Sequence, residues 1–457
     1  MLYEKKIVPP RLLLVFFSLF GATLMAQNYD PERLQEYIDA RVGSDLNQSI
    51  IVGVTSLSGE RFFTAGKVSA DNPREPKPDD VFEIGGVTNV FTAAAAASMV
   101  VDRQITWLQP VNAYLPDYVA VPSFGHLPLQ LVHLVTHTSG LPNIPPNLQP
   151  EDEKDPMAGY TFDHLYVLIS VYGLKIPPGE VYQYSTMGYG LLGHVLTLRA
   201  NQTYDELIQT RVARPLALKE TTAVLNPDTV VPGHQGLETV PNWHWGNGIV
   251  GGGGLYSSAR DLLRFVGAQM QMMKLEKDDQ RALLSTQNAY KQTSMPSTMV
   301  GYGWHITRKD LGAVYWQNGK TGGYAAYVGF NPSRRTGCVI LTNSAVPIDE
   351  LGFYVLDPEN FPLPEPPPTG IRPARTLEQY LGVYQVGPDV QLIITRDGGK
   401  LYAEISGEPK YRIYPMGKDE FAYATGNVRI FFKTGPREAE AVSVRIGMKQ
   451  MQGRRVK

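Results

Sequence analysis

The chain has 457 residues, of which 43% are hydrophobic and 19% are charged, and its formal net charge at pH 7 is −2. This composition is ordinary for a globular protein and excludes disorder as the default, and the length suits one large domain with a smaller one attached. A chain with a near-neutral charge lacks the excess of basic residues that is typical of proteins that bind nucleic acid or an anionic membrane. We therefore expect a small-molecule or peptide ligand and no nucleic acid.

The N-terminus has the features of a secretory signal. Three basic residues among the first eleven precede a nearly uncharged apolar run over residues 12–25, which ends at Ala26. A run of about 14 residues is short against the roughly 20 that span a bilayer, so a cleaved signal over residues 1–26 is favoured over an uncleaved anchor. We expect an exported protein, periplasmic or secreted, without a stable membrane anchor after cleavage.

The following segments predict a helix, a hairpin and a buried helix. Residues Pro31 to Val42 carry apolar and charged residues at helical spacing, with Asp30 as the cap. Two β-rich runs, Ile50 to Leu57 and Arg61 to Ala65, are joined by a Ser-Gly-Glu turn and predict a hairpin. The run from Val90 to Val101 is apolar nearly all round, as expected of a helix inside a domain.

Residues 82–93, FEIGGVTNVFTA, resemble the Ser-x-x-Lys segment of the serine β-lactamase and penicillin-binding protein superfamily, usually written F-x-x-[GA]-S-x-[ST]-K-x-[FV]-T-A. Gly86 stands at the position of the serine and Asn89 at that of the lysine. In the motif, one helical turn brings the amine beside the hydroxyl whose proton it takes. Glycine has no attacking atom and a neutral amide is no base, so the segment resembles a nucleophile helix without its nucleophile or its base.

Residues 178–193, PGEVYQYSTMGYGLLG, are similar to the Tyr-x-Asn segment of the same superfamily. Tyr184 is kept, and Thr186 replaces the asparagine. In active relatives the phenol helps to move protons and the amide orients lysine and substrate. Because this chain has no motif serine or lysine with which the phenol could exchange protons, Tyr184 is interpreted either as a packed structural aromatic or as a ligand contact.

The third motif, [KH]-[ST]-Gly on a strand beside the cleft, has two possible registers. The residues Lys320-Thr321-Gly322 match the motif letter for letter. The next run, GYAAYVGFNP over residues 323–332, resembles the family pattern that follows the motif and aligns it with Gln317-Asn318-Gly319. We prefer the second register, which puts Gln317 at the cationic position and Lys320 on the opposite strand face.

Backbone groups that bind an oxyanion need no particular side chain. The resemblance places the two amides of the oxyanion hole at Gly86 and Lys320. Together with Gly319 and Thr321 and the start of the buried helix, they form a candidate site for a carbonyl or carboxylate oxygen. No cofactor is expected, because the eight histidines show no metal-binding spacing.

Other nucleophiles are poor candidates. Thr88 points away from position 86 on a helix, Ser185 has no evident base, and Ser139 and His137 lie in a loop that resembles family scaffolding, LVHLVTHTSGLP. The single cysteine, Cys338, lies in an apolar strand-like run, where a buried small side chain is expected.

The resemblance implies an α/β fold of the β-lactamase/transpeptidase type over residues 27–356, with a central antiparallel sheet flanked by helices and a mostly helical region. A proline-rich linker is expected over residues 357–375. Residues 376–457 predict a small antiparallel β domain, similar to the lipocalin-like appendage of this family. Its predicted strands are Gln391 to Thr395, Leu401 to Ile405, Tyr411 to Tyr414, Glu420 to Tyr423, Val428 to Phe432 and Ala441 to Ile446.

Three functional hypotheses remain. The first is an exported, catalytically silent relative of β-lactamases, D-Ala-D-Ala carboxypeptidases and esterases, whose cleft binds a carboxylate or amide ligand such as a peptidoglycan peptide. The second is an active hydrolase with an unconventional nucleophile or bound water. The third is a structural or partner-binding protein with a vestigial cleft. If the two side chains at positions 86 and 89 alone are missing, Gly86→Ser with Asn89→Lys is expected to restore weak esterase activity.

Overall fold

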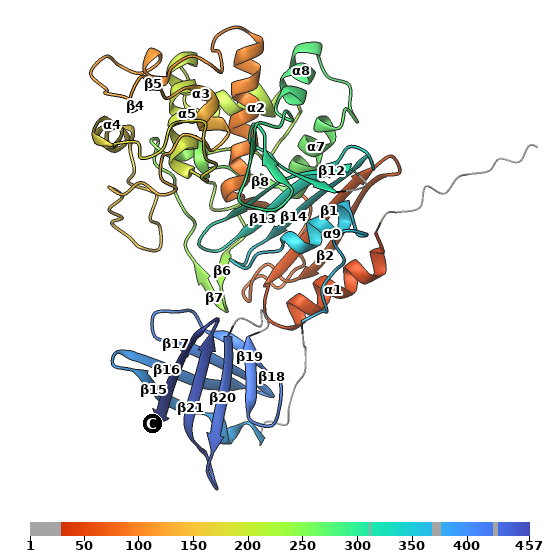
Figure 1. Cartoon of the computed structure of the whole chain (residues 1–457). Coiled ribbons are helices and arrows are strands. Elements are labelled where there is room, and N and C mark those ends of the chain that lie inside the picture. The colour runs from red at the N-terminus through yellow and green to blue at the C-terminus, as the bar shows by residue number, and fades with distance from the viewer. Residues whose placement is uncertain (1–28, 310–311, 368–375, 424–427) are drawn as a thin grey trace, which may run out of the picture.

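The computed structural model describes residues 29–309, 312–367, 376–423 and 428–457. The predicted signal peptide and the last part of the predicted linker lie outside these residues. Figure 1 shows a large body of helices packed on a sheet, followed along the chain by a separate barrel. Among the described residues, no helix combines the length and apolar character that a membrane crossing requires.

An antiparallel sheet of eight strands, in the order β2-β1-β14-β13-β12-β11-β10-β9, forms the centre of the large body. Its first strands come from the predicted N-terminal hairpin, and β1 pairs with β14 from the far end of the domain. The strands are β1 (Ser49–Ser56), β2 (Gly59–Gly66), β9 (Lys291–Gln292), β10 (Thr298–Val300), β11 (His305–Lys309), β12 (Gly312–Lys320), β13 (Ala325–Asn331) and β14 (Thr336–Thr342).

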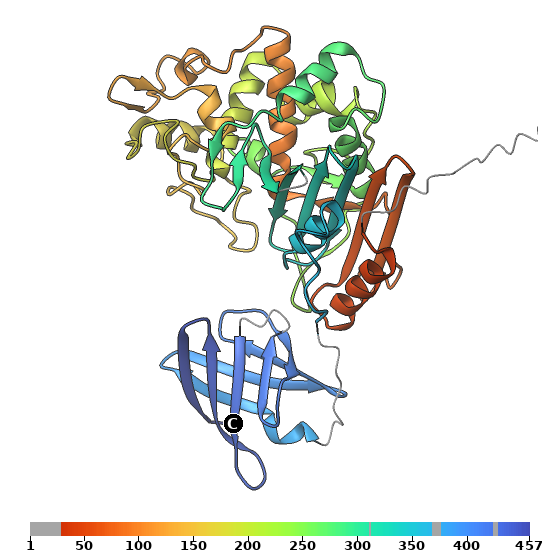
Figure 2. The same ribbon diagram turned by 45° about the vertical axis from the view of Figure 1, so that its right-hand side comes forward.

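Helices cover both faces of this sheet (Figure 2). Alternate residues of a strand point to opposite faces, so Ile51 belongs to one apolar cluster while Ile50 and Val52 belong to the other. The longer helices are α1 (Pro31–Gly43), α2 (Thr88–Val101), α4 (Phe162–Val171), α5 (Thr186–Ala200), α7 (Ala259–Gln269), α8 (Lys277–Ser285) and α9 (Asp349–Leu356). Because α1 and α9 pack on one face and α7 on the other, the central strands are buried on both sides.

Short elements complete the large body. The small helices are α3 (Leu131–Val135), α6 (Tyr204–Ile208), η1 (Gly85–Val87), η2 (Val111–Ala113), η3 (Gln209–Ala213) and η4 (Val250–Gly252). Paired short strands are β3 (Val81–Glu83) with β8 (Tyr256–Ser258), β4 (Ser123–Phe124) with β5 (Leu127–Pro128), and β6 (Gly233–Gln235) with β7 (Glu238–Val240). The predicted cap of α1 is confirmed, because the Asp30 carboxylate accepts hydrogen bonds from the amides of Glu32 and Arg33 at 2.9 and 3.2 Å.

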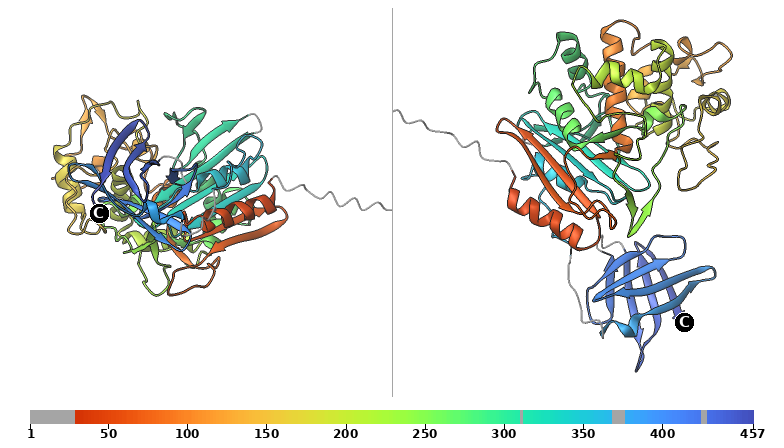
Figure 3. Two further views of the ribbon diagram at one scale, coloured as in Figure 1. Left: turned by 90° about the horizontal axis from the view of Figure 1, so that it is seen from below. Right: turned by 180° about the vertical axis from the view of Figure 1, so that it is seen from behind.

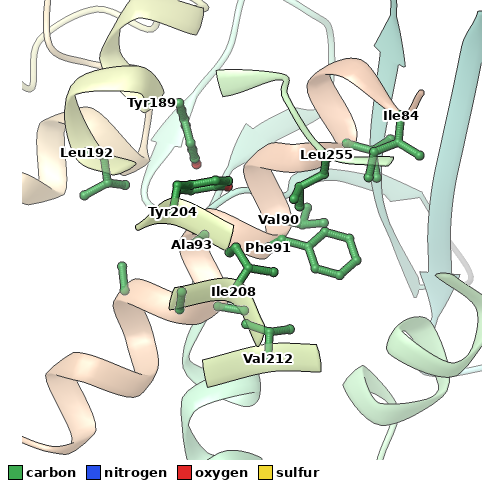
Figure 4. Close-up of a cluster of buried hydrophobic side chains, with 14 of the residues drawn as sticks. Ile84, Val90, Phe91, Ala93, Tyr189, Leu192, Tyr204, Ile208, Val212 and Leu255 are labelled. Carbon is green, nitrogen blue, oxygen red and sulfur yellow. The ribbon is translucent and has the colours of Figure 1, made fainter. Parts of the chain in front are cut away.

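Helix α2 is the buried helix that its alanine-rich sequence predicts. Figure 4 shows Val90, Phe91 and Ala93 surrounded by apolar side chains from α5, α6 and η3. Phe91 stacks on Phe265 of α7 with ring centroids 4.3 Å apart. This packing fixes the N-terminal end of α2, where Gly86 and Asn89 lie.

The single cysteine is buried as predicted. Cys338 lies on β14 with no exposed surface, packed in the cluster that α1 and α9 cover. Burial raises the pKa of its thiol, so the reactive thiolate is disfavoured.

Residues 376–423 and 428–457 form a closed antiparallel barrel of eight strands (Figure 3). All six predicted strands are present, and β15 and β22, which pattern reading did not find, close the barrel by pairing with each other. The elements are η6 (Glu378–Tyr380), β15 (Gly382–Gly387), β16 (Val390–Asp397), β17 (Lys400–Ile405), β18 (Tyr411–Pro415), β19 (Glu420–Tyr423), β20 (Val428–Thr434), β21 (Ala439–Ile446) and β22 (Lys449–Arg455).

Asp45, just after α1, links the large body to the barrel. Its carboxylate accepts hydrogen bonds from Lys400 at 3.0 Å, from Tyr402 at 3.3 Å and from Arg412 at 3.4 Å. The Arg412 guanidinium is almost fully buried and also donates to the carbonyl of Gly43 at 2.8 Å. A buried cation requires such partners, so Asp45 is the main charged contact in this cluster.

We expect Asp45→Asn to lower the free energy of unfolding by about 1–3 kcal/mol, because it removes the charge that faces the buried Arg412. Asparagine tolerates the positive φ of 56° at this position, so backbone strain adds little. Urea denaturation followed by circular dichroism measures the change. The control is Asp39→Asn on α1, where the exposed carboxylate accepts a hydrogen bond from Gln35. Equal stability of the two variants would contradict the role of Asp45.

Candidate active site

The segment that resembles the Ser-x-x-Lys motif starts in η1 and continues into α2. Gly85 has a φ of +48°, a conformation that favours glycine, and Gly86 follows it. One turn later Asn89 is fully buried, and its Nδ2 donates to the Tyr184 hydroxyl at 3.0 Å. The first two motif segments therefore meet in space, with an amide where the resemblance places a base.

Tyr184 lies directly before α5, at the end of a loop that α5 anchors. The cap of that helix is Ser185, whose hydroxyl accepts from the amide of Gly188 at 2.8 Å. The Tyr184 ring packs against His137 with centroids 4.4 Å apart. Burial raises the pKa of Tyr184, opposed by the hydrogen bond from Asn89, so the phenol stays protonated at neutral pH.

Thr186 occupies the asparagine position of the second motif, and it hydrogen bonds to an asparagine from elsewhere in the chain, Asn143. Its backbone amide and its hydroxyl donate to Oδ1 of Asn143, at 3.1 and 2.8 Å. The side chain of Asn143 is exposed and comes from the loop after α3. An amide is thus present beside Tyr184, supplied by a segment that motif reading did not select.

Gln317, at the cationic position of the third motif, is part of a buried neutral network. Its Nε2 donates to the carbonyl of Gly86 at 3.2 Å, and its Oε1 is 2.8 Å from Nδ1 of His305. Nε2 of His305 is 2.7 Å from the Tyr182 hydroxyl, so a single tautomer, protonated on Nδ1, satisfies all three contacts. Burial lowers the pKa of His305 to about 4. No member of this network carries a positive charge at neutral pH.

Strand β12 approaches η1 very closely at this point. A Cβ on Gly319 would lie 2.0 Å from the carbonyl oxygen of Ile84, so only glycine fits there. A Cβ on Gly86 would lie 2.7 Å from the carbonyl oxygen of Asn318 and 2.8 Å from the Tyr184 hydroxyl. A serine at position 86 therefore requires the strand or the tyrosine to move, and the expected recovery of esterase activity by two substitutions needs a third adjustment.

A cleft with a cavity volume of about 320 Å³ opens in front of these residues. Five of the predicted site residues line it: Gly86, Tyr184, Thr186, Gly319 and Lys320. The other three, Asn89, Gln317 and Thr321, are buried and do not line it. The other residues that line the cleft were not predicted from the sequence. These residues are Asn143, Ile144, Met157, Trp243, Trp245, Gly252, Asn318, Ala325, Pro347 and Asp349.

Two carboxylates lie in or near this cleft. Asp349 accepts a hydrogen bond from Nδ2 of Asn318 at 2.7 Å, and burial raises its pKa to about 6. Glu83 accepts from Nδ2 of Asn242 and from the amide of Trp243, both at 2.9 Å, and burial raises its pKa. Glu83 thereby holds the Trp243 segment in place, while Asp349 is itself part of the cleft wall.

The other hydroxyls and the histidine considered from sequence have structural roles. Thr88 accepts from the amide of Leu255 at 3.1 Å, Ser139 accepts from Leu141 at 3.2 Å, and Ser185 caps α5. His137 is fully buried, accepts from the amide of Ser185 at 3.1 Å, and has a pKa that burial lowers well below its usual value. None of these four lines the cleft.

Comparison with known proteins places this arrangement in a family. The family model described as Beta-lactamase matches residues 34–353. The chain belongs to this beta-lactamase family. Within it, the chain is 24% identical over 299 residues to the D-alanyl-D-alanine-carboxypeptidase/endopeptidase AmpH of Escherichia coli strain K12, covering 62% of this chain and 76% of that protein. It is 23% identical over 386 residues to a beta-lactamase of Lysobacter lactamgenus, covering 75% of this chain and 96% of the relative.

Solved structures of the beta-lactamase family share the fold. The octameric penicillin-binding protein homologue of Pyrococcus abyssi superposes with a TM-score of 0.64 at 19% identity and covers 93% of this chain and 100% of its own. A beta-lactamase/D-alanine carboxypeptidase of Yersinia pestis, complexed with citrate, gives a TM-score of 0.59 at 21% identity and covers 69% of this chain and 94% of its own. The expected fold class and superfamily are thus confirmed.

We expect Gly86→Ala to lower the free energy of unfolding by about 1–3 kcal/mol, because the added methyl group overpacks against the Asn318 carbonyl and Tyr184. Gly267→Ala on α7 is the matched control: nothing lies within 4 Å of its Cβ position, and alanine favours a helix by roughly 0.5–1 kcal/mol. Urea denaturation measures both. Wild-type stability of Gly86→Ala would show that the site has room for a side chain.

We expect the free energy of unfolding to fall in acid, because His305 is buried in its neutral form. Its folded pKa of about 4 lies below the unfolded value near 6.5, so its contribution is complete above pH 6.5 and is lost as the pH falls toward 4. The slope is at most about 1.4 kcal/mol per pH unit. Stability curves for wild type and His305→Gln between pH 7.5 and 4.5 test this, because the comparison cancels the opposite effect of Asp349, whose pKa is raised. Parallel curves would refute the expectation.

Proposed function

We propose that this protein is an exported, catalytically silent member of the beta-lactamase family, whose cleft binds a small amide or carboxylate ligand such as a peptidoglycan peptide. The observation that carries the proposal is the glycine at position 86, with backbone and phenol oxygens where a serine side chain would stand. Loss of the nucleophile from a triad-type hydrolase costs on the order of 10⁶ in turnover, and losing its partners adds little.

The neutral side chains at the other motif positions support the same conclusion. Asn89 and Gln317 are neutral, and each donates its amide hydrogen to an oxygen of the site, the Tyr184 hydroxyl and the Gly86 carbonyl respectively. The phenol of Tyr184 stays protonated because burial raises its pKa. Proton transfer from an attacking hydroxyl or water therefore has no ready acceptor among these groups.

Ligand binding is supported by what the cleft retains. Lys320, at the end of β12, lies against η1, with its backbone atoms within 3.1 Å of a Cβ position on Gly85, the residue before Gly86. We call the backbone amides of Gly86 and Lys320 the amide cradle, and such amides can hold a carbonyl or carboxylate oxygen without any catalytic side chain. One relative is the D-alanyl-D-alanine-carboxypeptidase/endopeptidase AmpH of Escherichia coli, so a D-Ala-D-Ala peptide is the first ligand to test. Export rests on the basic and apolar pattern of residues 1–26.

We expect no covalent labelling when the purified protein is incubated with a fluorescent penicillin or a fluorophosphonate, and no hydrolysis of p-nitrophenyl esters above the level of a Tyr184→Phe variant. Gel fluorescence and intact mass measure labelling, and absorbance measures hydrolysis. An active family member treated in parallel shows that the reagents work. Acylation, or turnover that Tyr184→Phe abolishes, would instead support an active hydrolase with an unconventional nucleophile.

We expect D-Ala-D-Ala peptides and muropeptides to raise the melting temperature, because a ligand that binds only the folded state stabilises it by RT ln(1 + [L]/Kd). The Gly86→Ala variant, whose methyl group would crowd the amide cradle, serves as the negative control once its own melting temperature is known. Absence of any shift across these ligands would favour a structural or partner-binding protein with a vestigial cleft.

A further inference from the structure

Asp349 places a negative charge in the wall of the cleft. It is the first residue of α9, and its carboxylate lies 2.7 Å from Nδ2 of Asn318, whose own carbonyl oxygen faces Gly86. Within the part of the chain that the structure describes, this is the only hydrogen bond to the Asp349 carboxylate. The group is therefore close to the amide cradle and still able to accept from a ligand.

The nearby charged groups leave Asp349 without a cation of its own. Arg41 is held by Glu350, by the carbonyl of Pro347 at 2.8 Å and by Asn47 at 2.8 Å. Lys320 lines the same cleft, but its side chain is exposed and makes no ion pair within 4.0 Å in the described residues. Arg41 only partly offsets the burial of Asp349, and Glu350 adds a second negative charge nearby.

An aromatic pair lines the same cavity. The rings of Trp243 and Trp245 lie with their centroids 6.1 Å apart at an angle of 54°. Both rings are held in place: a Cβ on Gly322 would lie 2.6 Å from Nε1 of Trp243, and a Cβ on Gly253 would lie 2.2 Å from the ring of Trp245. Indole faces attract cations, most strongly where water is partly excluded.

We propose that the cleft selects a ligand that carries a primary ammonium group, which Asp349 binds as a charge-assisted hydrogen bond beside the two tryptophans while a carbonyl oxygen of the ligand lies in the Gly86–Lys320 amide cradle. This proposal rests on the proposed function and names the ligand class of that site. It also predicts that a ligand with only a carboxylate at the Asp349 end is rejected, because two like charges at about 4 Å repel even at the effective dielectric of a protein surface.

The test compares three probes that share a phenylethyl skeleton: phenethylamine, neutral 2-phenylethanol and anionic 3-phenylpropanoate. Ligand-detected NMR titrations at pH 7.5 give the dissociation constants for the full-length protein. We expect phenethylamine to bind about tenfold more tightly than 2-phenylethanol, and more tightly than 3-phenylpropanoate, whose carboxylate is repelled by Asp349 and can be accepted only by the backbone amides of Gly86 and Lys320. Equal binding of the amine and the alcohol overturns the ammonium preference and leaves the ligand-binding cleft intact. Absence of binding by all three probes overturns the ammonium proposal, whereas the melting-temperature test with D-Ala-D-Ala peptides decides the ligand-binding part of the proposed function separately.

Asp349→Asn is the matched variant, because an asparagine oxygen can still accept from Asn318. We expect it to remove the tenfold preference for phenethylamine without changing the affinity for 2-phenylethanol. Asp389→Asn, in the exposed turn between β15 and β16, is the control and is expected to behave as wild type. A preference that survives in Asp349→Asn overturns the assignment of Asp349.

A pH titration of the wild-type protein tests the same point without a variant. The free carboxyl has a pKa of about 6 and an alkylammonium group stays protonated to about pH 10, so amine binding is strongest between these values. We expect the affinity for phenethylamine to fall about fivefold from pH 7.5 to pH 5.0, while that for 2-phenylethanol is constant. A flat profile for the amine overturns the proposal.

Discussion

The site depends on the close approach of strand β12 to the turn η1. Glycines at positions 85, 86 and 319 make this approach possible, because a Cβ at any of them would lie within 3 Å of backbone or side-chain atoms across the contact. The approach brings backbone amides together from elements far apart in sequence, and it lets Gln317 reach the Gly86 carbonyl. The same closeness leaves no volume for a side chain at position 86.

The neutral residues at the motif positions form two groups of hydrogen bonds. Asn89 donates to Tyr184, and Gln317 joins Gly86 to His305 and Tyr182. Buried polar groups are costly unless they are paired, so these hydrogen bonds stabilise the region around Gly86. Among the residues that the structure describes, Oδ1 of Asn89 has no hydrogen-bond partner, so the pairing is incomplete at this atom.

Much of the architecture is readable from the sequence, because its signals are local or belong to the family. The cap at Asp30, the N-terminal hairpin, the all-apolar α2 and six strands of the barrel follow from periodicity and turn residues. Strand β22 was not predicted, because its sequence, KQMQGRR, is polar and shows only weak alternation of apolar and polar residues. Without it, the closing of the barrel could not be foreseen.

Only part of the candidate site can be predicted from the sequence in the same way. Motif spacing finds Gly86, Asn89, Tyr184, Thr186 and Gln317, but it carries no information on Asp349, Trp243 or Trp245, which reach the cleft from loops and from the start of α9. Their place in the cleft depends on tertiary packing between segments about a hundred residues apart or more. Asp349 in particular follows β14 in a stretch without a motif, so its charge in the cleft becomes visible only in three dimensions.

The buried thiol on β14 has a practical consequence. Because Cys338 is the single cysteine and its side chain is buried beneath α1 and α9 with no exposed surface, a thiol reagent reaches it only when these helices leave the sheet or the domain unfolds. The rate of its alkylation in native buffer thus reports how often the middle of this domain opens, on a chain that needs no engineered label.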